Sequence, residues 1–370
     1  MIKYLYANNY KSFVNFKLDL NSMSLFLGNN GSGKSNAMLL IFKIVTLIRG
    51  NKQPLGDLFP NRDCTRWMKS NIQTFELGFE KDANKFVYHL EIEQDFDTYT
   101  SRIINETIKM DNLNLLHIEN GMAEVYDEIS ENNEKMFFNP LYSQVNSIPQ
   151  DKRFKSLSLF RECVNSIIYC VPDPKRMSSI VENDVYYPEI DMSNISSLFA
   201  GVVQIFPDFQ RNFTNTMKDI NPYFGSARIS LESYPKRLVV DHDYKGVVCS
   251  YYLEELSEGE KNLIAIYLLI NAYLRRGNTL LLDEPDNYLS LREIQPLCME
   301  LEELLLDSGQ CIMISHHPEV IDYFTDVGGI WFSKIESGET VIRSNPFYQQ
   351  DEEKILPYSK LIVRGIGENN

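Results

Sequence analysis

The sequence has few cysteines and no apolar run of the kind that marks a membrane span. Its six cysteines are scattered, with no Cys-x-x-Cys pair: Cys64, Cys163, Cys170, Cys249, Cys298 and Cys311. This pattern is typical of buried thiols in a reducing compartment. The longest apolar stretches are helix-sized or are interrupted by Lys43, and no signal peptide precedes the first expected strand. We therefore expect a cytoplasmic protein with no membrane partner.

Basic residues are outnumbered, with 36 Lys and Arg against 51 Asp and Glu and a net charge of -15. A protein that holds duplex DNA by many phosphates needs a basic face, so nucleic acid is possible but not favoured as a partner of this chain alone. Basic clusters at residues 152–155 and 175–176 could line a groove formed on dimerisation, although solvated loops explain them more simply. The chain also lacks a heptad run of the length that a long coiled-coil arm needs.

A complete phosphate-binding loop is present near the N-terminus. Its residues are Gly28, Asn29, Asn30, Gly31, Ser32, Gly33, Lys34 and Ser35. Glycines there can adopt backbone angles that other residues avoid, which leaves amides free to face phosphates. Lys34 would place its charge on the β- and γ-phosphates, and Ser35 would offer its hydroxyl to Mg²⁺. A strand over residues 24–27 and a buried helix over 36–48 are expected on either side. The loop predicts ATP and Mg²⁺ as ligands, with Asn36 completing the nucleotide-binding set.

Two adjacent acids follow an apolar run at residues 279–282, which suits a buried parallel strand ending in Asp283 and Glu284. Successive strand residues point to opposite sides, so the two carboxylates can have different roles. We assign Asp283 to Mg²⁺ through water and Glu284 to the attacking water as general base. The alternative is that two acids simply end a strand before Pro285.

The segment Leu256-Ser257-Glu258-Gly259-Glu260-Lys261 precedes a helix expected over residues 263–276. At the front of a helix, amides and a serine hydroxyl can meet an anion. The simpler alternative for Ser257 is an ordinary helix N-cap. Beside the loop and the acidic strand, this segment indicates a third nucleotide-handling motif.

Together these motifs resemble the ABC ATPase superfamily, and within it the soluble RecF-like and coiled-coil repair ATPases and the ABC-type ATPases of bacterial anti-phage systems. The resemblance covers residues 1–50 and 250–330. It implies an α/β fold, an ABC-type P-loop NTPase head with an inserted antiparallel β-lobe and a helical lobe. In that family two heads sandwich the nucleotide, which implies a homodimer or higher oligomer. Lys34, Ser35, Asp283 and Glu284 would then act in cis.

The same resemblance assigns roles to residues outside the three motifs. The signature residues Ser257, Glu258, Gly259 and Glu260 would act in trans, with Ser257 and Gly259 on the γ-phosphate of the partner's ATP. The family also has a switch histidine that contacts the γ-phosphate. His316, after a strand expected over residues 312–315, is the candidate for it, and His317 is the second choice. A metal-ligand fragment is the alternative, but no nearby spacing completes a zinc site.

The N-terminal segment Asn9-Tyr10-Lys11-Ser12-Phe13 resembles one in which a basic residue approaches the nucleotide phosphates. A solvated lysine is the alternative for Lys11, which lacks the bidentate geometry of arginine. The glutamine that senses Mg²⁺ in this family has its best candidate segment at residues 167–173, which contains no glutamine.

The middle of the chain predicts hairpins over residues 75–92, 115–126 (around Asn120-Gly121) and 238–252, and helical stretches over 153–170 and 193–220. Pro207 should break or kink the second helical stretch. We expect four segments: 1–70 with the P-loop, 71–150 as a β-rich insertion, 151–225 as a helical lobe, and 226–370 with the signature, acidic strand and histidine.

Two functions remain open on the sequence. The first is a slow or regulated ATPase head that acts as sensor or scaffold for a separate effector protein, such as a nuclease or toxin, in bacterial anti-phage defence. The alternative is a RecF-like DNA repair ATPase that clamps DNA. The acidic balance and compact length favour the first.

Overall fold

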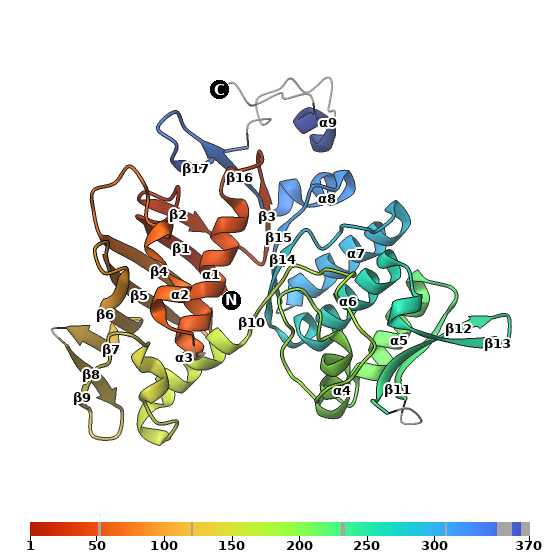
Figure 1. Cartoon of the computed structure of the whole chain (residues 1–370), viewed down its shortest axis with the longest axis horizontal. Helices are drawn as coiled ribbons and strands as arrows, with labels where there is room; N and C mark the ends of the chain where they lie inside the picture. Colours follow the sequence, from red (N-terminus) through yellow and green to blue (C-terminus); the bar gives the residue numbers. More distant parts are fainter. Residues whose placement is uncertain (51–52, 120, 231–233, 308, 346–356, 364–370) are drawn as a thin grey trace. The chain divides into compact units, whose positions relative to one another are not determined.

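The computed structural model describes residues 1–50, 53–119, 121–230, 234–307, 309–345 and 357–363. The chain divides into two compact units. The first contains Met1–Asn21, Leu27–Ile167 and Ile330–Asn345, and the second contains Ser22–Phe26, Ile168–Gly329 and the described part of the C-terminal segment. Each unit is therefore built from segments far apart in the sequence (Figure 1).

The first unit is built on an eight-stranded antiparallel sheet with the order β2-β1-β4-β5-β6-β7-β8-β9. The strands are β1 (Ile2–Asn8), β2 (Phe16–Asp19), β4 (Ile72–Lys81), β5 (Asn84–Asp95), β6 (Thr100–Met110), β7 (Leu113–Glu119), β8 (Met122–Asp127) and β9 (Asn132–Phe137). The hairpins expected over residues 75–92 and 115–126 are confirmed as β4–β5 and β7–β8. Asn120, expected in the turn of the second hairpin, lies outside the described residues. β2 and β1 form one edge of this sheet, and β4 to β9 follow them in chain order to the other edge.

Alternating apolar residues give this sheet a buried face. Phe79, Phe86 and Tyr88 are buried, and their rings lie 5.6, 5.9 and 6.1 Å from the ring of Phe160 on α3 (Lys155–Asn165). Apolar alternation of period two places such side chains on one side of a sheet, where a helix can cover them. The unit also contains α1 (Lys34–Arg49), α2 (Leu55–Leu58) and the strand pair β16 (Gly329–Lys334) and β17 (Thr340–Arg343).

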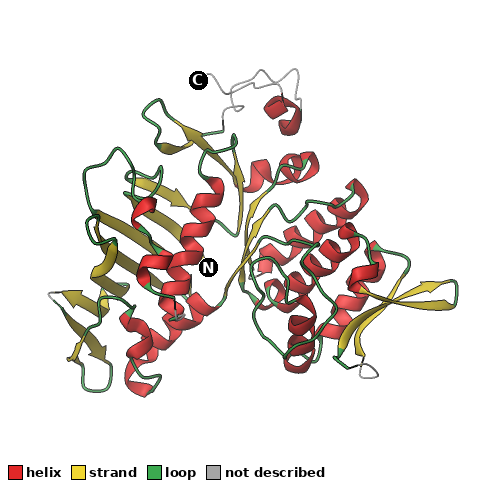
Figure 2. Cartoon of the chain, in the orientation of Figure 1, coloured by secondary structure: helices red, strands yellow, loops and turns green. Residues whose placement is uncertain are grey.

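The second unit contains strands in the order β10-β14-β15-β3. Strands are labelled in Figure 1 and are yellow in Figure 2. These are β10 (Ile167–Cys170), β14 (Thr279–Asp283), β15 (Gln310–Ile314) and β3 (Met23–Leu27). β14 pairs in parallel with β15, and β15 in parallel with β3. All residues of these strands are buried, as expected of a parallel sheet covered on both faces. The strands expected at residues 24–27, 279–282 and 312–315 are thereby confirmed within one or two residues.

Helices and a small sheet complete the second unit. The helices are α4 (Ile195–Ile205), α5 (Phe209–Ile220), α6 (Glu258–Ala272), α7 (Leu291–Asp307), α8 (Pro318–Gly328) and α9 (Tyr358–Val363). A three-stranded antiparallel sheet is formed by β11 (Phe224–Ser230), β12 (Arg237–Tyr244) and β13 (Val247–Tyr252). The hairpin expected over residues 238–252 is β12–β13. No helix in the described ranges is long and apolar enough to cross a bilayer.

Two helical expectations need correction. The stretch over residues 153–170 is helical only to Asn165, because the β-branched, fully buried run of β10 follows. The helix expected over residues 263–276 starts at Glu258, capped by Ser257, and ends at Ala272 before a 3₁₀ turn that Gly277 closes at φ 77°. The break expected at Pro207 is confirmed, since α4 ends before it and α5 begins after it.

Candidate nucleotide site

The P-loop lies in the first unit, directly after β3. Gly28 has a φ of 128°, and a Cβ there would lie 2.1 Å from the carbonyl oxygen of Phe332. Gly33 has a φ of 112°, and its Cβ would lie 2.8 Å from Oγ1 of Thr340. No side chain fits at either position without moving the neighbouring residue. The glycines of the motif are therefore required by close approach as well as by backbone angle.

The buried hydroxyls of Ser12 and Thr340 form a hydrogen-bonded chain that contacts the P-loop. The hydroxyl of Thr340 donates to the carbonyl oxygen of Ser32 at 2.8 Å. Because that uses its single hydrogen, the 2.8 Å contact with Ser12 must have the Ser12 hydroxyl as donor. The amide of Thr340 also donates to the Ser12 carbonyl at 2.9 Å. β17 and the N-terminal segment thus hold the P-loop together.

The loop offers unused hydrogen-bonding capacity where an anion would sit. Gly33 is the N-cap of α1 and supplies no side-chain cap, so the first amides of the helix keep their capacity for an external acceptor. The hydroxyl of Ser32 is buried and has no hydrogen-bond partner among the described residues. Lys34 Nζ donates to the carbonyl oxygens of Gly28 and Asn29 at 2.5 and 3.0 Å, and Ser35 is exposed. These residues fit a nucleotide phosphate.

Lys11 is half-buried beside the same helix. It has a φ of 51°, and its Nζ donates to Oδ1 of Asn36 at 3.0 Å. Burial, more than any neighbouring charge, lowers the pKa of Lys11. The amine is thus hydrogen-bonded to the first turn of α1, and the role of Lys11 toward a phosphate stays a prediction.

In the second unit, β14 delivers the two acids. Asp283 is buried at the end of the strand, while the Glu284 side chain is about half-exposed. Glu284 has a φ of 51°, unusual for a non-glycine residue, and its amide donates to the Ile314 carbonyl at 2.9 Å. Such backbone conformations are often found at functional sites.

The Glu284 carboxylate is held from two sides. Nδ2 of Asn287 donates to Oε2 at 2.9 Å, and Nε2 of His316 lies 3.6 Å from Oε1. His317 has a different task, because its Nδ1 accepts the amide of Glu319 as the N-cap of α8. Of the two histidines considered from the sequence, His316 is the one beside the acid.

The loop after Glu284 is tied to the interior of the unit. Nδ2 of the buried Asn262, on α6, donates to the carbonyl oxygens of Pro285 and Asn287 at 2.7 and 2.6 Å. Asp286 is also buried and accepts the Ser315 hydroxyl at 2.8 Å, while its other oxygen, Oδ1, has no hydrogen-bond partner in the described ranges. Burial is the main cause that raises the pKa of Asp286.

The signature segment opens α6. Ser257 is its N-cap, accepting the Glu260 amide at 3.3 Å, while Glu260 Oε2 accepts the Ser257 amide at 3.1 Å. The Ser257 hydroxyl also donates to Oε2 of Glu260 at 2.9 Å. A Cβ on Gly259 would lie 2.8 Å from the Tyr288 carbonyl, so this glycine allows the loop to approach the helix. The capping interpretation of Ser257 is correct. Glu258 is partly exposed, with Lys175 Nζ 3.9 Å away.

The predicted site residues thus form two groups. The P-loop residues, Lys11 and Asn36 belong to the first unit, and Asp283, Glu284, His316 and the signature belong to the second. The sequence missed the supporting residues Ser12, Thr340, Asn262 and Asn287. Asn262 could have been found from the sequence, because it is a polar residue at the start of an apolar helix. Thr340 could not, because it lies 308 positions from its partner Ser32.

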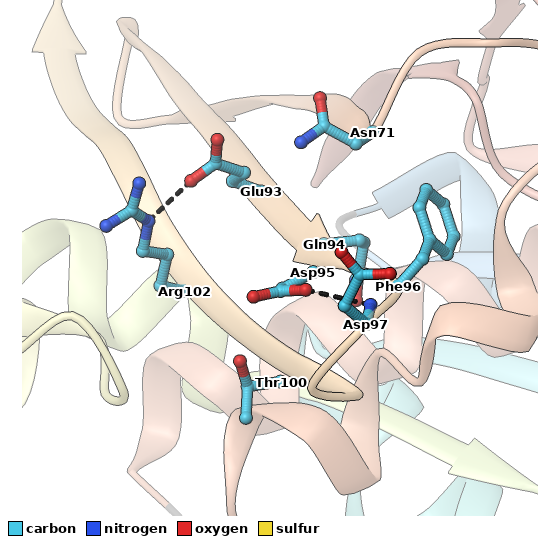
Figure 3. A pocket seen from close by; sticks show the side chains of 8 residues that line it. All are labelled: Asn71, Glu93, Gln94, Asp95, Phe96, Asp97, Thr100 and Arg102. Carbon is cyan, nitrogen blue, oxygen red and sulfur yellow. Dashed lines mark hydrogen bonds and ion pairs between the residues drawn. The ribbon is translucent and has the colours of Figure 1, made fainter.

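A hollow of about 560 Å³ at the ends of β5 and β6 contains none of the predicted residues (Figure 3). Glu93 there pairs with Arg102 at 2.5 Å, and Oδ1 of Asp95 accepts the amides of Asp97 and Thr98 at 2.9 and 3.1 Å. Glu93 is thus engaged in an ion pair and Asp95 in the turn between the two strands, and both contacts stabilise the hairpin.

Comparison with solved structures identifies the architecture. An SMC head bound to the C-winged helix domain of ScpA matches with a TM-score of 0.57 and 15% identity, covering 93% of this chain and 97% of that one. The chain has the fold of an ABC-type ATPase head. A second match, from Pyrococcus furiosus, is an SMC head domain with an extended coiled coil, bound to the C-terminal domain of ScpA. Its TM-score is 0.50 at 14% identity, covering 93% of this chain and 96% of that one. No protein-family model and no curated protein matches the sequence.

The predicted α/β ABC-type head with antiparallel and helical parts is therefore confirmed. At such low identity the comparison concerns the fold alone, and the activity must be argued from the residues.

Proposed function

We propose that the chain binds and hydrolyses ATP with Mg²⁺, slowly or under regulation, and dimerises around ATP as the sensor or scaffold that controls a separate effector in bacterial anti-phage defence. One observation carries the ATPase part. Glu284 is half-exposed, and Asn287 and His316 hold its carboxylate at the end of a buried parallel strand in an ABC-type fold. A carboxylate so oriented can accept a proton from an attacking water.

The residues divide the work. Lys34 and the P-loop amides bind the β- and γ-phosphates, Ser35 and Asp283 hold Mg²⁺, and Glu284 orients the water. Ser35 and Asp283 would hold Mg²⁺, which when bound would neutralise charge on the phosphates. His316, whose Nε2 lies 3.6 Å from Oε1 of Glu284, would contact the γ-phosphate.

The signature segment is the basis for the proposed dimer. Ser257, Glu258, Gly259 and Glu260 belong to the partner's nucleotide in this proposal, with the capped start of α6 directed at its γ-phosphate. The hydrogen bonds between Ser257 and Glu260 fix the position of the serine at the start of α6. In this proposal ATP is bound between two copies of the chain, and its hydrolysis lets the two copies separate.

A protein effector, such as a nuclease or toxin, is favoured over DNA by charge. The chain carries a net charge of -15, and the basic clusters are partly neutralised, since Arg153 pairs with Glu134 and Asp151, and Arg176 with Asp191. Few cations remain there for phosphates. The matched SMC heads were solved with fragments of ScpA, a protein partner. The DNA-clamp alternative gains no support from a basic groove at these clusters.

The test uses Glu284→Gln, expressed in the native host and purified in Mg²⁺ and ATP, with Lys34→Ala as the control that lacks phosphate binding. We expect Glu284→Gln to bind ATP, to hydrolyse it at least about 100-fold more slowly, and to sediment as a dimer. Adding Ser257→Arg to Glu284→Gln should leave ATP binding intact and abolish the dimer. Mass spectrometry of the trapped dimer should identify a stoichiometric effector that Lys34→Ala does not retain.

Each part of the proposal has its own contrary result. Wild-type turnover in Glu284→Gln would exclude this residue as the base. A dimer that survives Ser257→Arg would contradict the trans signature. Recovery of DNA with repair proteins, in place of an effector, would favour the RecF-like alternative.

A further inference from the structure

The three-stranded sheet of the second unit ends in an exposed edge strand, β13. In the described part of the chain β13 pairs with β12 alone, and the hairpin that they form extends past the helices of the unit (Figure 1). None of its six residues is buried, and Val247 and Val248 are 63% and 64% exposed. An edge strand presents a row of unpaired N–H and C=O groups that another strand can bind.

Natural sheets protect such edges with charged residues or proline. β13 reads Val-Val-Cys-Ser-Tyr-Tyr and has neither. The edge strand β10 is buried throughout. The other edge strands in the described ranges each carry at least one charge: Lys17 and Asp19 on β2, Glu134 and Lys135 on β9, Arg228 on β11, and Arg343 on β17. β13 is thus an apolar edge without the protection that the others have.

The strand that fits this edge is a second copy of β13. When a strand pairs antiparallel with its own copy about a two-fold axis, a charged residue on the axis faces its like. Self-pairing of β9 centred on Glu134 or on Lys135 would have this defect. β13 has no charge that could repel its copy, and its β-branched and aromatic residues favour cross-strand pairing.

We propose that two copies of the chain pair antiparallel through β13, with Cys249 on the two-fold axis, to form a continuous six-stranded sheet. This register places Val247 opposite Tyr251 and Val248 opposite Ser250 of the second copy, so both exposed valines are covered. Centring on Ser250 would place Val247 opposite Leu253, which lies beyond the strand in a 3₁₀ turn. This interface needs no nucleotide and is separate from the ATP-dependent dimer proposed above.

Charges that flank the strand support a second copy as the occupant. Lys245, exposed in the turn before β13, has no ion pair within the described residues. In the proposed register it faces Leu253 of the second copy, so it lies next to that copy's Glu254 and Glu255. Each copy supplies one such cation and receives one, because the two-fold axis repeats the contact. The two ends of the interface are therefore complementary in charge.

The net charge of -15 opposes self-association, but the acids of the sheet are too distant to prevent it. Asp241 and Asp243 lie on β12. In the paired sheet, β12 and its copy would be three strand spacings apart, about 14 Å. This exceeds the Debye length of about 8 Å at physiological ionic strength. The contact is small, so we expect a weak dimer with a Kd on the order of 10 μM.

The experiment is sedimentation of the full chain without nucleotide, from about 1 to about 200 μM, for wild type and for Lys34→Ala, which excludes retained ATP. We expect both to pass from monomer to dimer. Val248→Lys places a charge on the edge and should weaken the dimer at least tenfold, by a rough estimate. The matched control is Val327→Lys, which adds the same charge at a valine 60% exposed on α8 and should dimerise as wild type does.

Cys249 tests the register. It is partly exposed, whereas the other five cysteines are buried. Residues directly opposite on antiparallel strands have Cα atoms about 4.5 to 5.5 Å apart, a separation that a disulfide can bridge. Dithiodipyridine accepts the two electrons and two protons released when two thiols join, so it should link the dimer covalently. Cys249→Ser should abolish this link, and adding Ser250→Cys to that variant should not restore it, because position 250 faces position 248.

The contrary results are distinct. A monomer at every concentration, a dimer unaffected by Val248→Lys, or equal weakening by Val327→Lys would overturn self-pairing through β13. Linking through Ser250→Cys as fast as through Cys249 would overturn the register. Shielding of Cys249 by a different protein that co-purifies, and that Val248→Lys fails to retain, would assign the edge to that partner instead. None of these results depends on ATP, so failure of the proposed ATPase function would be seen separately.

Discussion

The two units hold their functional residues by different physical means. In the first, the P-loop is held by close backbone approach, with Gly28 against Phe332 and Gly33 against Thr340. In the second, Glu284 and Asp286 are held by side-chain hydrogen bonds from Asn287 and Ser315. The first arrangement should be sensitive to added volume, and the second to lost polar partners and to pH.

The largest effect should come from adding one methyl group to the P-loop. Gly28→Ala places a Cβ against the Phe332 carbonyl at a φ of 128°, so the loop must move. We expect nucleotide affinity to fall about 100-fold, equivalent to about 3 kcal/mol. The control is Gly121→Ala, which also has a positive φ but no atom within 4 Å of the new Cβ. Calorimetry with Mg²⁺ and ATP would contradict the steric account if both variants bind alike.

A smaller effect should follow from removing a polar partner in the second unit. Asn262→Leu deprives the carbonyl oxygens of Pro285 and Asn287 of their donor in a buried setting. We expect the free energy of unfolding to fall by about 2 kcal/mol and hydrolysis to slow, because the loop after Glu284 loses its anchor.

The matched control is Asn271→Leu on the same helix, where Nδ2 donates to the Tyr267 carbonyl. This variant should also lower stability in urea denaturation, yet hydrolyse at the wild-type rate once corrected for the folded fraction. Equal slowing in both variants would mean that general destabilisation, and not the loop anchor, limits turnover.

The smallest effect concerns pH. Burial raises the pKa of Asp286 above its unfolded value, so the folded state binds more protons between the two values. Its contribution to stability is fully present below the unfolded pKa of about 4 and is lost as pH rises through the folded pKa. Asp286→Asn removes this dependence. Urea midpoints for wild type minus Asp286→Asn should therefore decrease from pH 4 to pH 7, and an increasing difference would reverse the assigned sign.

Local patterns predicted much of this molecule. Alternating apolar residues sufficed for β4–β5, and the proline rule for the break between α4 and α5. The strand β10 was missed because a short apolar run after a helix has no period that separates it from more helix. The motifs could be located in the sequence because each is a short, contiguous segment with its own chemistry, and the roles of their residues stay predictions.

The sequence by itself therefore determined where a phosphate-binding loop motif lies between a strand and a helix, which acids end a strand, and where a helix begins near Ser257, because each depends on neighbours within a few positions. Tertiary structure alone decided that Thr340 supports Ser32, that Asn287 and His316 flank Glu284, and that β13 lies at the edge of its sheet. Contacts between distant segments depend on how β-strands and turns pack, and no local pattern in the chain encodes that packing.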